Sequence, residues 1–563
     1  MFTQPLIFLL GVLMSPIAGI ISQNDGGVTT QVVSMLDVMQ PDTSAVWVIT
    51  DSHPAKSSRG TRKRQVLAQL SLPLGVRPLE QPYFDVSEGT VLLYEGELYN
   101  SEELSTKLDM KYSLSRNSEL VACLLRREQG TLTTRAKSVL DVLDGSYVLV
   151  IEESGETVIA RDPMGTKPVY LASDAGVLAF ASNKRPLWQI GMSNVVPLRA
   201  GTMAIVDETG VKIENVFSLV DEQSKINDLS MAVDCYQKAL VLSVEKRLVD
   251  VSEVGLLLSG GVDSCLLAKL LADLAIERGI NVVAYTVGVR GSEDVDNARA
   301  FAQEIGVDCR VRELDISEVE DYIPDVIETV EERDFVQVEA GIGIYAATEM
   351  AGQDGIEVMF SGQGPDELWG GYEWYPKILE AEGYSGLCQR MRDDLNRADV
   401  ETLDRENKIA MVHGMEMRFP YVDPAVVDLA INVAPELKVD SPDSLGKIVH
   451  RALACEIGLP EGYAYRPKNA AQHGIGVHSV LKHVAAKNGF DDELVASLGY
   501  SSDKITLEKL GSSSRYGYKY ADESMWQVSQ PVQFFLDVTA YEHGLLNEAE
   551  RTRIEKFVER LEA

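Results

Sequence analysis

The chain has 563 residues, of which 45% are hydrophobic and 25% are charged, and its formal net charge is −34 at pH 7. A length of this order predicts more than one domain, each with a sizeable core. The composition is that of a globular protein, and the acidic balance argues against a nucleic-acid partner, which clustered Lys and Arg would have to hold.

The N-terminus and the cysteines bear on location. Residues 5–21 carry no charge, but they are short for a membrane-spanning helix and are interrupted by Gly11 and Pro16. We interpret Met14 as the natural start and residues 1–13 as an upstream extension, and we expect no membrane segment. The six cysteines are scattered without CxxC pairs, which indicates neither a zinc site nor a disulfide framework. They favour a reducing cytoplasm.

Residues 14–217 are rich in strand patterns with short connections. Apolar runs predict the strands Ala45–Thr50, Thr90–Tyr94, Tyr147–Glu152 and Thr157–Ala160. Helical spacing of apolar residues predicts a helix over Ser118–Arg127. We therefore expect an N-terminal α+β domain over residues 14–217, and the polar residues 218–228 are a plausible linker.

From residue 229 the pattern alternates between helices and apolar strands. The predicted strands are Val254–Leu258, Asn281–Val287, Cys309–Leu314 and Ile356–Phe360. This alternation predicts an α/β domain with a doubly wound parallel sheet over residues 229–500, in which ligands bind beyond the carboxyl ends of the strands. Residues 501–563 are expected to form a polar, helical extension.

The motif SGGVDS, at Ser259–Ser264, lies between a predicted strand and a predicted helix. A glycine-rich turn in this position gathers backbone N–H groups at a helix N-terminus, where phosphate is attracted. Asp263 would repel bare phosphate, so its presence favours a Mg²⁺ ion between the two. No Gly-Lys-Ser/Thr follows at the required spacing, which excludes a Walker loop.

A second motif, SGQGPDELWGGY at Ser361–Tyr372, directly follows the strand Ile356–Phe360. Its glycines permit a ligand to approach the backbone. Asp366 lies at the end of a strand predicted to neighbour the one before Asp263. The two aspartates could therefore share one Mg²⁺ ion on the phosphates.

SGGVDS resembles the pyrophosphate loop of the ATP pyrophosphatases, and both motifs resemble the synthetase domain of the asparagine synthetase family. Two later segments, GMEMRFPYVD at Gly414–Asp423 and RPKNAAQHG at Arg466–Gly474, are also similar to that family. The resemblance implies ATP and Mg²⁺ as cofactors and Asp263 and Asp366 as metal ligands. It also implies an ATP and pyrophosphate site formed by Leu258, Ser259, Gly260, Gly261, Asp263, Ser264, Val287, Ser361 and Gly362.

The same resemblance assigns further roles. Lys468 would stabilise the adenylate intermediate, a role suited to a compact ammonium group. Arg418 could grip a substrate carboxylate, or it could form a structural ion pair with Glu416, and both residues are candidates for substrate binding. Gln363 stands where the family usually has glutamate, which puts proton transfer at that position in question.

Segments of residues 14–217 resemble the glutaminase domain of the class II glutamine amidotransferases, which implies an Ntn-hydrolase-like sandwich. They include SPIAGI, EGELYN, LDGS, ARDPMGTKPVY and FASNKRPL. The residues that carry the family's chemistry are changed. Ser15-Pro16 replaces the N-terminal Cys-Gly, Glu95-Gly96 replaces the Asn-Gly oxyanion pair, Asn117 replaces an acidic residue, and Gln69 replaces an arginine. A carboxylate would oppose a developing oxyanion, so we interpret this domain as structural, with its glutaminase chemistry lost.

The leading hypothesis is therefore an asparagine synthetase-like ligase that joins aspartate and ammonia through an acyl-adenylate, releasing AMP and pyrophosphate. Ammonia would come from solution or from a separate glutaminase. The partner of this chain would be such a glutaminase or a second copy of the chain in a homodimer. Three alternatives stay open: a β-lactam synthetase-like ligase, which typically has tyrosine at Gln363; a tRNA-modifying enzyme, which the acidic balance disfavours; and a non-catalytic interaction protein.

Overall fold

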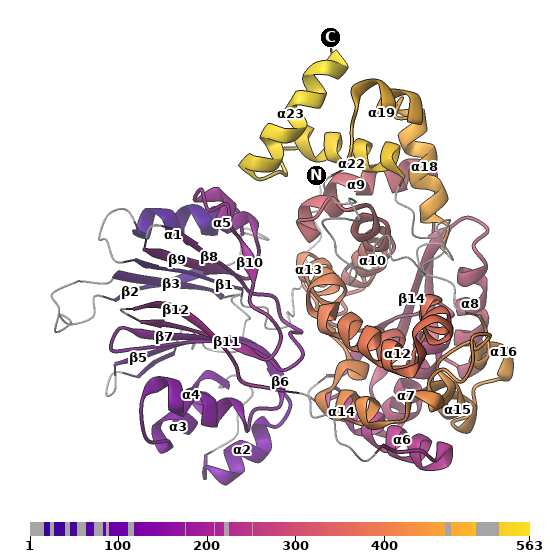
Figure 1. Ribbon diagram of the computed structural model, residues 1–563. Coiled ribbons are helices and arrows are strands. Elements are labelled where there is room, and N and C mark those ends of the chain that lie inside the picture. The colour runs from indigo at the N-terminus through magenta and orange to yellow at the C-terminus, as the bar shows by residue number, and fades with distance from the viewer. Residues whose placement is uncertain are drawn as a thin grey trace, which may run out of the picture. The chain divides into compact units, whose positions relative to one another are not determined.

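The computed structural model describes residues 16–22, 28–39, 46–52, 64–71, 83–85, 89–110, 117–174, 176–207, 209–218, 225–249, 251–467, 475–502 and 529–562. The chain divides after Ser218 into two compact units (Figure 1). Unit 1 also includes the short segments Gly352–Glu357 and Met411–Glu416, and unit 2 comprises the remainder. No helix among the described residues is long and apolar enough to cross a membrane.

Unit 1 contains two six-stranded sheets. The first has the order β10 (Val196–Pro197), β8 (Tyr170–Asp174), β9 (Val177–Ala181), β1 (Ile17–Ser22), β3 (Arg64–Ser71), β2 (Val46–Ser52). The second has the order β12 (Gly210–Asn215), β11 (Thr202–Asp207), β7 (Glu156–Arg161), β6 (Gly145–Glu153), β5 (Thr90–Leu98), β4 (Tyr83–Asp85). Neighbouring strands in both sheets run antiparallel.

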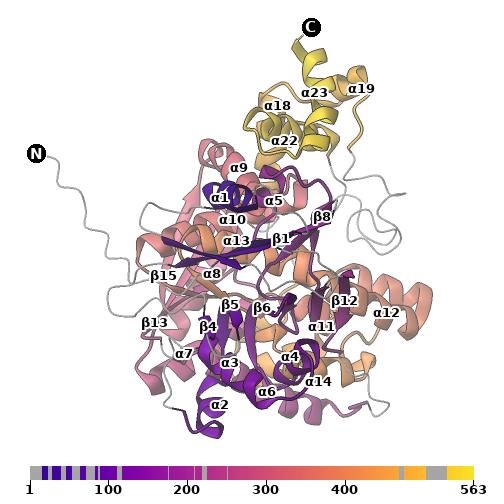
Figure 2. The same ribbon diagram turned by 90° about the vertical axis from the view of Figure 1, so that its left-hand side faces the viewer.

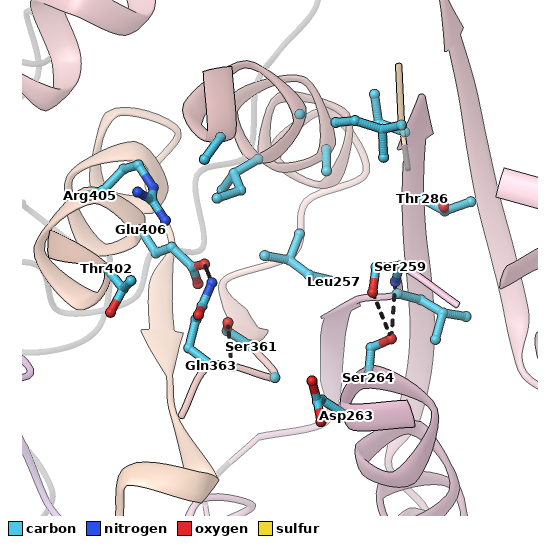
Figure 3. Close-up of a pocket in the computed structure, with 18 of the residues that line it drawn as sticks. Leu257, Ser259, Asp263, Ser264, Thr286, Ser361, Gln363, Thr402, Arg405 and Glu406 are labelled. Atoms are coloured by element: carbon cyan, nitrogen blue, oxygen red, sulfur yellow. Dashed lines mark hydrogen bonds between the residues drawn. The ribbon is translucent and has the colours of Figure 1, made fainter. Parts of the chain in front are cut away.

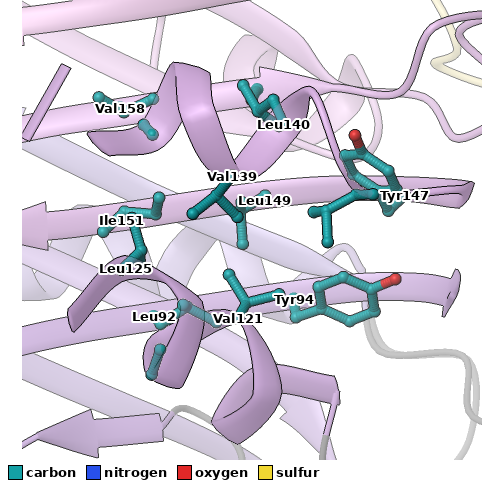
Figure 4. Packing of buried hydrophobic residues seen from close by; sticks show 14 of the residues in the cluster. Leu92, Tyr94, Val121, Leu125, Val139, Leu140, Tyr147, Leu149, Ile151 and Val158 are labelled. Carbon is teal, nitrogen blue, oxygen red and sulfur yellow. The ribbon is translucent and has the colours of Figure 1, made fainter. Parts of the chain in front are cut away.

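The alternation of side chains in each strand builds three buried layers in unit 1. In β5, Val91 and Leu93 face the first sheet, whereas Leu92 and Tyr94 face helices. Those helices are α2 (Ser101–Lys107), α3 (Asn117–Arg127) and α4 (Leu132–Leu140). Figure 4 shows residues of α3 and α4 packed against β5 and β6. Helices α1 (Val28–Asp37) and α5 (Arg185–Gln189) cover the other face of the first sheet. The resulting helix–sheet–sheet–helix sandwich confirms the expected α+β fold.

Unit 2 is built on a five-stranded sheet with the order β15 (Asp308–Leu314), β14 (Asn281–Val289), β13 (Glu253–Leu257), β16 (Val358–Phe360), β17 (Glu416–Arg418). The pairs β13–β14, β14–β15 and β13–β16 are parallel, as the sequence predicts. From β13 the chain adds β14 and β15 on one side and then returns to place β16 on the other. The strand order therefore reverses beside β13, and the loops after β13 and β16 meet at the position where such sheets bind ligands.

Helices surround this sheet. They are α6 (Leu229–Lys246), α7 (Val262–Arg278), α8 (Glu293–Ile305), α9 (Ile316–Val330), α10 (Phe335–Gln353), α11 (Pro365–Trp369), α12 (Trp374–Glu401), α13 (Leu403–Val412), α14 (Pro424–Asn432), α15 (Ile448–Glu456) and α16 (Glu461–Ala464). Helix α7 follows β13 directly, and α11 follows β16. The two helices that matter most for the site thus begin beside each other.

The C-terminal part of the chain packs into unit 2. Helices α18 (Val477–Lys487), α19 (Asp492–Leu498), α22 (Gln530–Glu542) and α23 (Glu548–Glu562) lie together in both views (Figures 1 and 2). Asp537 on α22 is fully buried, and its carboxylate lies 2.8 Å from Arg333 Nε and 2.7 Å from the hydroxyl of Tyr500. The described part of the predicted polar extension is thus helical. A buried ion pair between Asp537 and Arg333 joins it to the rest of unit 2.

Candidate functional site

The loop between β13 and α7 is fixed by its own side chains. Gly260 has φ 75°, a conformation that favours glycine, and a Cβ there would lie 3.0 Å from the carbonyl oxygen of Asp294. The Ser264 hydroxyl accepts a hydrogen bond from the N–H of Ser259 at 3.2 Å and donates one to the carbonyl oxygen of Gly261 at 3.1 Å. The turn is therefore held at the N-terminus of a long helix, where an anion is favoured.

Lys447 joins the two motif aspartates. Its Nζ lies 2.7 Å and 2.8 Å from the two carboxylate oxygens of Asp263 and 2.7 Å from Oδ1 of Asp366. The Lys447 side chain is only 1% exposed, whereas those of Asp263 and Asp366 are 17% and 13% exposed. The carboxylates predicted to share a metal do converge, and a buried cation holds them together.

His450 supports this cluster from behind. Its Nε2 lies 3.1 Å from Oδ1 of Asp263, and its Nδ1 lies 2.9 Å from the hydroxyl of Tyr236. Burial lowers the pKa of His450, so the ring is neutral at pH 7 and has one donor and one acceptor nitrogen. We assign the proton to Nε2, because the Asp263 carboxylate can only accept. The Tyr421 hydroxyl adds a hydrogen bond of 2.8 Å to the carbonyl oxygen of Asp263.

A pocket of about 230 Å³ opens beside these loops (Figure 3). Its phosphate-loop side carries Ser259, Asp263 and Ser264. Its apolar wall includes Val287, Ala340, Ile344 and Ile475. The other side carries Gln363, Glu401, Thr402, Arg405 and Glu406, so the pocket has an anion-binding side and a mixed, mainly acidic side.

Gln363 and Glu406 form a pair in this pocket. Nε2 of Gln363 donates to Oε1 of Glu406 at 2.6 Å, and the two side chains point toward each other in Figure 3. Burial raises the pKa of Glu406, and Arg405, Ser361 and Gln363 partly oppose that rise. Arg405 itself donates to Oε1 of Gln337 at 2.9 Å and to the carbonyl oxygen of Glu401 at 3.0 Å. Gln363, which stands where the family usually has glutamate, is thus hydrogen-bonded to the carboxylate of Glu406.

Most of the candidate ATP-binding residues lie around the pocket. Those that line it are Leu258, Ser259, Asp263, Ser264, Val287, Ser361 and Gly362, and the second candidate metal ligand, Asp366, lines it as well. Gly260 and Gly261 shape the turn beside it. Glu416 and Arg418 are not among the described residues that line the pocket. Arg418 donates to the carbonyl oxygen of Arg247, and its own carbonyl oxygen accepts from the N–H of Ser361 at 3.0 Å. Their substrate-binding role stays a prediction, as does that of Lys468, which lies outside the described residues.

Sequence reasoning missed Lys447, Arg405 and Glu406. Lys447 precedes the first residue of α15, and a cation at a helix N-terminus opposes the helix dipole. That placement signals an external anionic partner. Arg405 and Glu406 belong to a run of polar residues, Arg405–Lys408, that is buried throughout. The run is indistinguishable in sequence from a solvated helix face, so no local signal identifies it.

The candidate glutaminase positions lie in unit 1, except Ser15, which is outside the described residues. Gln69 is on β3 opposite Ile17 of β1, and Asn117 is the buried first residue of α3. Gly96 has φ 120°, and a Cβ there would lie 1.9 Å from the carbonyl oxygen of Ser146. Only glycine fits that position, so Gly96 has a structural role independent of catalysis.

Glu95 is buried in β5 with a polar partner. Its Oε2 accepts from the Ser182 hydroxyl at 2.6 Å, and Ser182 Oγ in turn accepts from the N–H of Ile17 at 3.0 Å. Burial raises the pKa of Glu95 to about 7, against an ordinary value of 4.5, although the Ser182 hydrogen bond and Lys167 lower it. The network therefore links Glu95 to the first residues of β1.

The two aspartates fit Mg²⁺ when phosphate is present. No group of three or more His, Cys, Asp or Glu side chains that could hold a metal occurs among the described residues. Mg²⁺ often takes only one or two carboxylates, with phosphate and water oxygens completing its shell. Asp263 and Asp366 at the phosphate loop match that donor set, and a bound Mg²⁺ would neutralise charge on a pyrophosphate leaving group.

The raised pKa of Glu95 predicts a pH-dependent cost to folding. Because the unfolded chain ionises at lower pH than the folded one, the free energy of unfolding falls as pH rises from about 4.5 to about 7. The full loss is about 3 kcal/mol. Glu95→Gln stays neutral and can still accept from Ser182, so we expect it to raise the thermal midpoint at pH 8 and much less at pH 5. The exposed Glu128→Gln is the control, and an equal gain at both pH values would contradict the account.

Comparison with known proteins identifies the family. The asparagine synthase family model matches residues 236–385 and 379–537, and a glutamine amidotransferase domain matches residues 69–189. A protein of Methanocaldococcus jannaschii named as a glutamine-hydrolysing asparagine synthetase is 30% identical over 74% of this chain and 83% of its own length. Proteins so named from Schizosaccharomyces pombe and Escherichia coli are 27% and 26% identical, over 81% and 74% of this chain and 86% and 76% of theirs.

The synthase matches span more than half of the chain and include both aspartate motifs. They extend to residue 537, which includes helix α22 up to its buried Asp537. The chain therefore belongs to the asparagine synthetase family and is an ATP-dependent ligase of the asparagine synthase type.

Proposed function

We propose that this chain makes asparagine from aspartate, ATP and ammonia. An oxygen of the aspartate side-chain carboxylate attacks the α-phosphorus of ATP, and the bond to the β-phosphate oxygen breaks to release pyrophosphate. Ammonia then attacks the acyl carbon, AMP leaves with the electron pair of the broken C–O bond, and one proton is released. The observation that carries this proposal is the convergence of Asp263, Asp366 and Lys447 at the phosphate loop.

That cluster suits the first step. ATP would place its phosphates against the N-terminus of α7 and the hydroxyls of Ser259 and Ser264. Asp263 and Asp366 would hold Mg²⁺, which offsets the charge of the departing pyrophosphate. Lys447 lies within hydrogen-bond distance of both carboxylates, so its ammonium group could also donate to a phosphate oxygen bound beside them. Lys468, from the later loop, is proposed to stabilise the adenylate.

Replacement of the cluster tests this step. We expect Asp263→Asn and Asp366→Asn each to lower aspartate-dependent ATP–pyrophosphate exchange by at least about 10²-fold, because the leaving group loses its metal. Asp273→Asn is the matched control, since Asp273 is also on α7 but is 53% exposed and pairs only with Lys269 in the described contacts. Exchange near the wild-type rate in either site variant at saturating Mg²⁺ would remove the metal assignment.

We further propose that the amidotransferase-like domain no longer hydrolyses glutamine. Glu95 lies where the family has the asparagine of its oxyanion pair, and it is buried rather than displaced toward solvent. Its ionised form, which predominates above its pKa of about 7, opposes the negative charge that develops on the glutamine amide oxygen. Free ammonia or a separate glutaminase would then supply nitrogen. The six cysteines, none in a disulfide, fit a reducing cytoplasm as the setting.

Nitrogen-source assays test the lost chemistry. Ammonium should support asparagine formation, with a rate that rises with pH because only neutral ammonia is nucleophilic. Glutamine should support turnover at less than about one hundredth of that rate, since even the loss of one oxyanion donor costs about 10²-fold or more. Glutamate release from glutamine by the chain beginning at Ser15 is the measurement. Release at a rate comparable to ammonium-dependent synthesis would show that Ser15 is a working nucleophile.

A further inference from the structure

Amide formation in this pocket needs a proton acceptor. When ammonia attacks the acyl-adenylate, a C–N bond forms and the nitrogen becomes positively charged. The intermediate can expel AMP productively only after that nitrogen loses a proton. At neutral pH ammonia also exists mostly as ammonium, which must be deprotonated before it attacks. A base within the pocket would serve both needs.

Four carboxylates line the pocket among the described residues: Asp263, Asp366, Glu401 and Glu406. Asp263 and Asp366 are bonded to Lys447. Glu401 is held by Arg397, whose Nε lies 3.1 Å from Glu401 Oε1. Glu406 differs from these three, because no cation contacts its carboxylate within ion-pair distance in the described part of the chain. Glu406 is therefore the carboxylate of this pocket whose negative charge is left to attract a proton.

The two oxygens of Glu406 have different environments. Oε1 accepts the hydrogen bond from Gln363, whereas Oε2 is buried and accepts none in the described structure. The side chain is 1% exposed. A buried carboxylate oxygen without a donor carries an energetic cost, and it is retained here on the wall of a ligand pocket. Such an oxygen could accept a hydrogen bond, or a proton, from a positively charged amine in the pocket.

We propose that Glu406 is the base that accepts the proton from the attacking amine, with Gln363 as the positioning residue that orients it. This inference rests on the proposed function. The proton moves from nitrogen to Oε2 as the C–N bond forms, and AMP then leaves with its electron pair. Gln363 fixes Oε1 through its amide, so that Oε2 faces the reacting nitrogen.

The surroundings of Glu406 favour this role. Burial raises its pKa, which makes the carboxylate a stronger base than an exposed glutamate. The groups that face it are Arg405 on its own helix, Ser361 and Gln363 from the loop after β16, and Glu401 on α12. Arg405 lowers the pKa, but its guanidinium is engaged by Gln337 and the Glu401 carbonyl. Burial and these neighbouring groups therefore act on the pKa of Glu406 in opposite directions.

The test separates the two half-reactions in the Glu406→Gln variant, whose amide keeps the shape of the side chain and an oxygen for Gln363. We expect aspartate-dependent ATP–pyrophosphate exchange to fall by less than about threefold, since adenylation transfers no proton from an amine. Ammonium-dependent asparagine formation should fall by about 10²–10³-fold. The rate with hydroxylamine as the nucleophile, which is neutral at pH 7, should fall by less than about tenfold. The ammonium-dependent rate that remains in the variant should rise more steeply with pH than that of the wild type.

A double variant distinguishes proton transfer from mere support of the loop. Gln363→Glu with Glu406→Gln preserves one carboxylate and one amide in the pair but exchanges their places. It should recover the ammonium-dependent rate to within about tenfold of the wild type. An unchanged ammonium-dependent rate in Glu406→Gln, or equal losses with ammonium, hydroxylamine and exchange, would overturn the proposal. Exchange by the wild-type chain reports separately on the proposed function, because that step does not involve Glu406.

Discussion

The site depends on a buried lysine between two carboxylates. Asp263 and Asp366 lie in the first turns of α7 and α11, which follow the neighbouring strands β13 and β16, and their two carboxylates would repel each other. Lys447 lies between them, with Nζ at 2.7 Å from each carboxylate, and its single positive charge offsets one of the two negative charges. Burying three charges is costly, and such clusters are weak evidence of stability. We interpret the cluster instead as a binding site, in which the two carboxylates would hold Mg²⁺ and the lysine would contact phosphate.

The fold explains how these groups meet. The reversal of strand order beside β13 places the loops after β13 and β16 together, and the short strand β16 delivers Asp366 on the first turn of α11. His450 and Tyr421 then fix Asp263 from behind. The same pocket changes character across its width, from hydroxyls and a helix N-terminus to the Gln363–Glu406 pair. The proposed phosphate chemistry and the proposed amine chemistry would therefore use opposite sides of one cavity.

Local sequence patterns predicted the sheet and the two aspartates of this site, but they missed the residues from distant parts of the chain that contact them. Strand–helix alternation and the glycine-rich turns predicted the parallel sheet and the convergence of Asp263 with Asp366. Lys447 is 184 positions from Asp263, and Glu406 is 43 positions from Gln363, so no periodicity connects them. Arg418 was a candidate for substrate binding through the resemblance of its segment to the family, and the structure shows its guanidinium donating to the carbonyl oxygen of Arg247. In unit 1 the sandwich was predictable, but the burial of Glu95 depends on packing that sequence does not reveal.

The most direct test of the account follows oxygen. Aspartate labelled with ¹⁸O in its side-chain carboxylate should be converted by the wild-type chain, with ATP, Mg²⁺ and ammonium, to asparagine and AMP. If the carboxylate attacks the α-phosphorus, as the account requires, one labelled oxygen appears in the phosphate of AMP and none in pyrophosphate. Label in pyrophosphate or inorganic phosphate, or unlabelled AMP accompanying asparagine formation, would contradict the acyl-adenylate route.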